Sequence, residues 1–204
     1  MLFISKQGHV DAERVKLAIH PAIERGPMHK VNGIVVHQTN GPTVQSTFHS
    51  YQHKDANGAH FLIDKDGTIY QTASLSTRTD HVGRLKSRCL STHECAPAEL
   101  KAVTTMQYKY KKLSNREYRK KFPERYPSNM DSIGIELVGV AHERDAAGGK
   151  KKEKVYETVT IEQNASLQWL VRELIETFGV EADEVYRHPD LSRKNLTEAT
   201  TAKW

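Results

Sequence analysis

The stretch VNGIVVHQTNGPT, residues 31–43, joins a hydrophobic run to a polar loop. Val31, Ile34, Val35 and Val36 are β-branched, as is typical of a buried strand. His37 stands where this run gives way to a loop composition. A strand over residues 32–37 would hold His37 rigidly at the mouth of a cleft. A histidine held in this way is a candidate functional residue, although histidines at strand ends are commonly structural.

Hydrophobic periodicity predicts the other elements of an α/β domain, in which strands alternate with helices. Thr160, Gln163 and Gly179 bracket the clearest helix as a capping box and a C-terminal glycine. The polar stretch 143–154 reads as a solvated loop. With 204 residues the chain is long enough for one well-packed domain. We expect helices over 10–26, 43–53, 160–178 and parts of 84–130, a hairpin within 59–72 and a strand over 132–141.

The composition excludes a membrane-spanning segment. The mean hydropathy is −0.65, and no stretch approaches the roughly 20 apolar residues that a span requires. The N-terminus lacks the apolar segment of a signal peptide, so we expect no passage through the general secretory route. The cysteines, Cys89 and Cys95, are too few for a disulfide scaffold. A short-loop disulfide and two free thiols remain equally open.

Positive charge is concentrated in residues 84–130, which we call the basic segment. It contains 12 Lys and Arg against four Glu, a net +8, whereas the rest of the chain carries −3. Such a segment favours polyanionic partners, either nucleic acid or the anionic polymers of a cell wall. A solvated helical surface is an equally good interpretation. The chain has no recognisable nucleic-acid-binding motif, so we expect no nucleic-acid partner.

A second histidine, His188, also stands where a short apolar segment meets a loop. A catalytic zinc site uses three protein ligands and keeps one position open for water. The loop after His188 offers Asp190 and Glu198 as the third ligand. Asp190 is equally suited to cap the next turn, whereas Glu198 requires the loop to double back. No HExxH motif is present, so any such site is not carried on a single helix.

Five short motifs together resemble the type 2 N-acetylmuramoyl-L-alanine amidases, a family that includes phage lysozyme-type amidases, anhydro-muropeptide amidases and peptidoglycan recognition proteins. The resemblance implies a single domain, residues 1–204, with a central mixed sheet flanked by helices and one zinc ion in a surface cleft. It also implies cleavage of the amide between the lactyl group of N-acetylmuramic acid and L-alanine. The motifs are GIVVHQT (33–39), GAHFLIDKDGTIYQ (58–71), DHVG (80–83), SIGIELVG (132–139) and YRHPDLSRKNLTEA (186–199).

The resemblance assigns roles to individual residues. His37 and His188 match two zinc ligands, and Glu198 falls where the family has its third. Glu136 matches the glutamate that acts as general base in the recycling members. His81 matches a cleft histidine, which we expect to bind substrate. We also expect substrate contacts from two further residues, His60 and Arg193.

The chain departs from the family at several positions. Leu196 stands where many members have a lysine that stabilises the oxyanion, so we assign that role to Lys194, with Arg193 as the alternative. Ala59 replaces a tyrosine of the phage members. The basic segment is longer than the usual connection and is expected to be a partly helical insertion beside the cleft. We expect its lysines and aromatic side chains to recruit polymer, with a catalytic lid as the alternative.

The biological role is less constrained by the sequence than the reaction. We expect a zinc-dependent peptidoglycan amidase with a lytic, antibacterial role, either an endolysin or an effector delivered to the periplasmic wall by a route other than general secretion. Secretion machinery and an immunity protein would then be partners. The alternatives are a cytoplasmic amidase that recycles muropeptides and a receptor that binds peptidoglycan without turnover.

Overall fold

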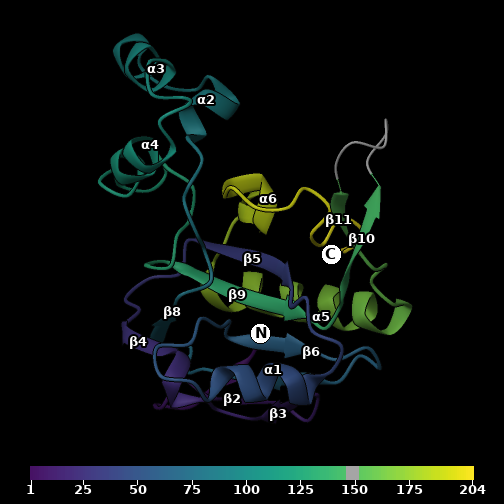
Figure 1. Ribbon diagram of the computed structural model, residues 1–204. Helices are drawn as coiled ribbons and strands as arrows, with labels where there is room; N and C mark the ends of the chain where they lie inside the picture. Colours follow the sequence, from purple (N-terminus) through teal and green to yellow (C-terminus); the bar gives the residue numbers. More distant parts are fainter. Residues whose placement is uncertain (146–151) are drawn as a thin grey trace.

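The computed structural model describes residues 1–145 and 152–204 of the chain. Its centre is a six-stranded sheet, as predicted (Figure 1). β6 and β7 pair antiparallel and every other neighbouring pair is parallel, so the sheet is mixed. Across the sheet the order is β12 (Val185–Arg187), β5 (Gly33–Gln38), β9 (Ser132–Leu137), β6 (Phe61–Ile63), β7 (Ile69–Gln71) and β3 (Val15–Leu17).

The main core lies between one face of this sheet and helix α5 (Ile161–Phe178). Thr160 accepts a hydrogen bond from the Gln163 backbone, and Gly179 ends the helix at φ 65°, as the capping pattern predicts. Within the described ranges, no helix combines the length and apolar composition needed to cross a bilayer. The sheet contributes alternate residues to this core, including Ile34, Val36, Ile133, Ile135, Leu137, Phe61 and Ile63.

The opposite face of the sheet carries the candidate functional residues. His37 on β5 and Glu136 on β9 are register partners, so both side chains leave the sheet on the same face. Helix α1 (Val44–Tyr51) covers part of this face, where Val44 packs against Leu62. The alternation along the two strands therefore separates a core face from a face that carries the site.

The predicted helix over residues 10–26 is wrong. That region forms short strands and a 3-10 turn, in which Val15 pairs with Ile69 at the sheet edge. The interruption by Pro21 and the β-branched residues favour extended backbone over a helix. The short elements outside the main sheet include β1 (Phe3–Ile4), β2 (Val10–Asp11), η1 (Pro21–Ile23), β4 (Glu24–Pro27), β8 (Thr77–Thr79) and η2 (Ala182–Glu184).

The predicted loop over 143–154 is also largely wrong. Its flanks pair as a two-stranded ribbon of β10 (Ala141–Asp145) and β11 (Lys152–Tyr156). The centre of that predicted loop, residues 146–151, lies outside the described residues. β11 lies beside the loop that follows α6 (His188–Leu191), to which Lys154 and Tyr156 are hydrogen-bonded.

The basic segment contains three short helices, α2 (Arg88–Thr92), α3 (Pro97–Thr104) and α4 (Tyr110–Glu117). Figure 1 shows them standing away from the sheet at the upper left, with α6 between them and the β10–β11 ribbon. A small core of Cys89, Val103 and Leu113 holds the three helices together. Cys89 and Cys95 form a disulfide, which decides the alternative that the sequence left open.

We expect loss of this disulfide to loosen the three helices without disturbing the sheet. The bond joins two cysteines that are six residues apart in sequence and so closes a short loop. The chain-entropy relation assigns a stabilisation of about 2 kcal/mol to a loop of this length. Replacing Cys89 and Cys95 by Ser should lower the opening free energy of α2–α4 by about that amount, measured by native-state hydrogen exchange. Unchanged protection in both the variant and the reduced wild type would contradict this.

Candidate metal and catalytic site

Three side chains that are far apart in sequence meet at one point above the sheet. His37 comes from the end of β5, His188 from the first turn of α6, and Glu198 from the loop that follows. One ligand atom from each lies within 4.8 Å of the other two. Glu198 Oε1 lies 3.0 Å from His188 Nδ1 and 3.5 Å from His37 Nδ1. The loop doubles back as the sequence prediction requires.

Burial and charge set His37 and Glu198 in the protonation states that metal ligands need. Burial and the neighbouring His188 lower the pKa of His37 to about 4, so its ring is neutral. Burial alone would raise the pKa of Glu198, but hydrogen bonds from His188 and His37 outweigh it and lower that pKa to about 2. The cluster therefore offers a neutral imidazole and a charged carboxylate around neutral pH.

The residues present fit a zinc ion. Ligand atoms about 2.1 Å from a tetrahedral zinc lie about 3.4 Å from one another, close to the separations found here. Glu198 is 5% exposed and contacts no Lys or Arg among the described residues. A buried carboxylate without a cationic partner is costly, and a dication would compensate it. His37, His188 and Glu198 are thus the residues that would hold the metal.

Asp190, the competing third ligand, has another task. Its Oδ2 accepts a hydrogen bond from the Arg187 backbone N–H at 3.0 Å and caps α6. An N-terminal cap of this kind satisfies a backbone donor that the helix itself leaves free. The geometry therefore selects Glu198 over Asp190.

Glu136 lies beside this cluster, in a cavity of about 440 Å³ that also contains His37, His188 and Glu198. Its Oε2 is buried and has no hydrogen-bond partner among the described residues. Burial, with repulsion from Glu198, raises the pKa of Glu136 to about 8, and Lys194 opposes this rise. A carboxyl group with its pKa near the working pH suits proton transfer.

His81 holds His37 in place from behind. Its Nδ1 lies 3.0 Å from His37 Nε2, and its Nε2 lies 3.2 Å from Ser132 Oγ. A Cβ atom at Gly134 would lie 2.8 Å from the His81 ring, so the close approach of this ring to β9 requires glycine there. His81 also lines the cavity, and its predicted contact with substrate stays a prediction.

His60 does not line the cavity that contains Glu136, and its expected contact with substrate stays a prediction. The side chain is fully buried, and both ring nitrogens serve the backbone. Nδ1 accepts a hydrogen bond from the Gly134 N–H at 3.1 Å, and Nε2 lies 2.9 Å from the Thr77 carbonyl. His60 therefore fastens β9 to the neighbouring strands.

The two basic neighbours in the loop after α6 diverge. Lys194 lines the cavity and lowers the pKa values of His37 and Glu136. Leu196, which stands at the position of the family lysine, is exposed. Arg193 turns to the basic segment instead, with its guanidinium 3.3 Å from the centroid of the Tyr110 ring. Arg193 thus contacts the basic segment and does not line the cavity, and its expected contact with substrate stays a prediction. The expected role of Lys194 in place of the family lysine also stays a prediction.

Tyr156 on β11 is a cavity residue that the sequence reasoning missed, and Lys154 accompanies it. Burial, followed by repulsion from Glu198 and Glu136, raises the pKa of Tyr156 to about 12. The phenol therefore stays protonated and offers a hydrogen-bond donor. Its only signal in the sequence is the two-residue spacing from Lys154 along a strand, which the loop prediction concealed.

The fold and the site define an α/β domain with the donor set of a metal-dependent hydrolase. Residues 27–201 match the N-acetylmuramoyl-L-alanine amidase family. The chain therefore belongs to this family, whose activity is that of a peptidoglycan amidase. No curated protein matches it in sequence.

Solved structures share the fold at low sequence identity. The AmpD derivative has a TM-score of 0.57 at 17% identity and covers 100% of this chain and 96% of its own. The Ph2119 endolysin from a Thermus scotoductus MAT2119 bacteriophage has a TM-score of 0.51 at 16% identity, with coverage of 93% and 94%. The catalytic domain of XlyA has a TM-score of 0.50 at 17% identity, with coverage of 88% and 87%.

Removing the His81 ring is expected to weaken zinc binding although His81 is not a ligand. Partners that orient a ligating histidine typically contribute 10- to 100-fold in metal affinity, so His81→Ala should raise the zinc Kd by about that factor. His81→Asn, whose amide can occupy the place of Nδ1, should restore most of the affinity. Titration against a chromogenic chelator measures both, and an unchanged Kd in His81→Ala would refute this positioning role.

Proposed function

We propose that the protein is a zinc-dependent amidase that hydrolyses the bond between the lactyl group of N-acetylmuramic acid and L-alanine in peptidoglycan. One observation carries the proposal. Side chains of His37, His188 and Glu198 converge within 4.8 Å, in the same cavity as Glu136. Family membership over residues 27–201 supports the choice of bond.

In this proposal, a zinc ion held by His37, His188 and Glu198 would supply Lewis-acid polarisation of the scissile carbonyl and of the attacking water. Glu136 accepts a proton from that water and delivers it to the amine of L-alanine as the bond breaks. Its buried, unpartnered Oε2 supports this role. Lys194 contributes positive charge at the cavity, where negative charge develops on the carbonyl oxygen.

We extend the proposal to a lytic role on the cell wall. The disulfide between Cys89 and Cys95 supports this, because disulfides persist in oxidising compartments and are rare in the cytosol. Recycling in the cytoplasm would place this bond in a reducing environment. A receptor without turnover is disfavoured by the complete set of ligand side chains in His37, His188 and Glu198.

Digestion of purified sacculi, followed by mass spectrometry, tests the proposal. The zinc-loaded protein should release whole stem peptides that begin with a free L-alanine, and it should leave glycan strands with intact lactyl groups. Cleavage within the stem peptide would make it a peptidase. Turnover of soluble muropeptides alone would indicate recycling, and binding to sacculi without any product would indicate a receptor.

A further inference from the structure

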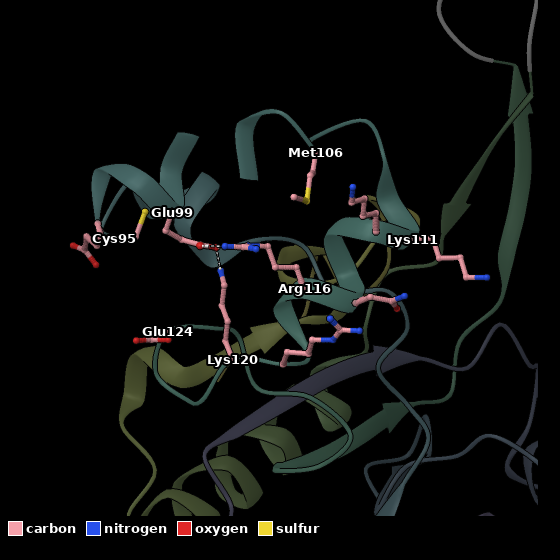
Figure 2. Close-up of a pocket in the computed structure, with 12 residues that line it drawn as sticks. Cys95, Glu99, Met106, Lys111, Arg116, Lys120 and Glu124 are labelled. Carbon is pink, nitrogen blue, oxygen red and sulfur yellow. Dashed lines mark hydrogen bonds and ion pairs between the residues drawn. The ribbon is translucent and has the colours of Figure 1, made fainter. Parts of the chain in front are cut away.

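A second cavity lies in the basic segment and not at the metal cluster. It has a volume of about 860 Å³ and shares no lining residue with the cavity that contains Glu136. Residues of α3, of α4 and of the turn that follows α4 surround it (Figure 2). Its basic lining residues are Lys111, Lys112, Arg116, Arg119 and Lys120.

Two of these basic side chains, Arg116 and Lys120, are held by ion pairs within the basic segment. Glu99 lies between Arg116 and Lys120 in Figure 2. Glu99 Oε1 accepts a hydrogen bond from Arg116 Nε at 3.0 Å and lies 2.8 Å from Lys120 Nζ, which also pairs with the buried Glu117 at 2.7 Å. The hydrogen bond from Arg116 is the largest cause that lowers the pKa of Glu99 to about 2. Arg116 and Lys120 are therefore neutralised within the fold.

The other three, Lys111, Lys112 and Arg119, are exposed and form no ion pair with a described residue. All three line the cavity, Lys111 and Lys112 from the first turn of α4 and Arg119 from the turn that follows the helix. Cys95 and Met106 add apolar surface to the same cavity. The combination fits a ligand that carries anionic groups on an organic chain.

The cavity is braced against the rim of the catalytic cleft. Tyr110, the first residue of α4, stacks under Arg193, which also donates a hydrogen bond to the Gln107 carbonyl at 3.2 Å. The next residue along the chain, Lys194, lines the cleft itself. Arg193 thus links α4, which carries part of the cavity lining, to the loop that carries Lys194.

We propose that this cavity binds the carboxylate-bearing stem peptides of the peptidoglycan polymer, as a second site that retains the substrate. The identity of this polymer rests on the proposed function, whereas the anion-binding chemistry does not. The expected part of the aromatic side chains stays a prediction. Tyr126 is buried, whereas Tyr108 is 80% exposed and Tyr110 and Tyr118 are each 39% exposed. Among the described residues, no aromatic side chain lines the cavity, so the cavity itself offers charge and not aromatic stacking.

The test compares two triple variants in a Glu136→Gln background, which prevents turnover during binding. The first replaces Lys111, Lys112 and Arg119 by Gln. The control replaces the exposed Lys101, Lys109 and Lys121, which lie in the same segment but outside the cavity lining, so both variants lose three charges. Lys120 is left unchanged because its ion pairs hold Glu99 and Glu117. Circular dichroism verifies that both variants fold.

Binding to purified sacculi is then measured against salt concentration. Three exposed charge contacts at about 0.2–1 kcal/mol each predict about a tenfold loss of affinity in the cavity variant, with a flatter salt dependence. The control should change less than about threefold, since only the long-range field is reduced. Equal losses in both variants, or no loss in either, would overturn the proposal. When the same two triple variants are made in protein that retains Glu136, turnover of a small soluble muropeptide should change less than twofold in both.

Chemical treatment of the sacculi identifies the anion. Hydrofluoric acid removes phosphodiester-linked wall polymers, and binding should survive it. Carbodiimide-driven amidation neutralises the stem carboxylates, and the difference between the two variants should then disappear. Loss of binding after hydrofluoric acid would show that the ligand is a phosphate polymer and overturn the assignment to stem peptides. Because binding is measured without turnover, failure of the amidase proposal would be seen separately.

Discussion

The His37→Ala variant is expected to lose both zinc and amidase activity while keeping its fold. The Nδ1 atom of His37 lies 3.5 Å from Glu198 Oε1, so its removal opens one side of a three-residue cluster. Partners that merely orient a ligand contribute 10- to 100-fold in affinity, and loss of a ligand itself should exceed about 100-fold. Metal analysis by mass spectrometry after dialysis against dilute zinc measures the content directly.

A matched pair of carboxylate variants tests the third ligand. Glu198→Ala should lose zinc as His37→Ala does, because Glu198 supplies the only carboxylate in the cluster among the described residues. Asp190→Ala should keep zinc and lose about 1 kcal/mol of stability, the usual contribution of a helix cap. Near-stoichiometric zinc in His37→Ala, or zinc loss confined to Asp190→Ala, would refute the assigned ligand set.

The sequence predicts the site best where local pattern and strand geometry coincide. A β-branched run followed by His37, and a second strand with Glu136 between Ile135 and Leu137, are both visible in the letters. Parallel pairing in register then places His37 and Glu136 side by side on one face. Glu198 could be named as a ligand, but its choice over Asp190 required the path of the loop.

What the sequence missed depends on contacts between distant segments. His60 and His81 look alike as polar residues next to short strands, yet one serves the backbone of Gly134 and the other orients His37. Tyr156 enters the cavity because β10 and β11 pair, and a run of charged residues conceals that pairing. No local pattern distinguishes such cases, since the partner atoms come from residues far along the chain.

The ion pairs of the basic segment also could not be predicted from the sequence. Counting residues gives a net +8, but it treats all lysines and arginines as equivalent. The structure divides them, because Glu99 and Glu117 neutralise Arg116 and Lys120 while Lys111, Lys112 and Arg119 stay exposed. The basic segment therefore contains a cavity lined by three basic side chains, Lys111, Lys112 and Arg119, that form no ion pair with a described residue.

The second large effect is expected at Glu136, where activity and metal binding should separate. Glu136→Gln keeps the size of the side chain and removes the proton acceptor. Glu136 is not a member of the metal-binding group, so zinc content should stay close to that of the wild type. Turnover should fall roughly 10²-fold or more, because general-base catalysis contributes about that much.

The position of Glu136 makes this variant informative. The buried Oε2 has no protein partner among the described residues, so the carboxylate is not required to complete an ion pair or a hydrogen-bond network. Burial raises the pKa of Glu136 to about 8, which makes the charged form unfavourable in the metal-free fold. A neutral amide should therefore leave the thermal stability of the metal-free protein unchanged or higher. Reduced stability together with lost activity would indicate a structural role, and full activity with intact zinc would mean that another group accepts the proton.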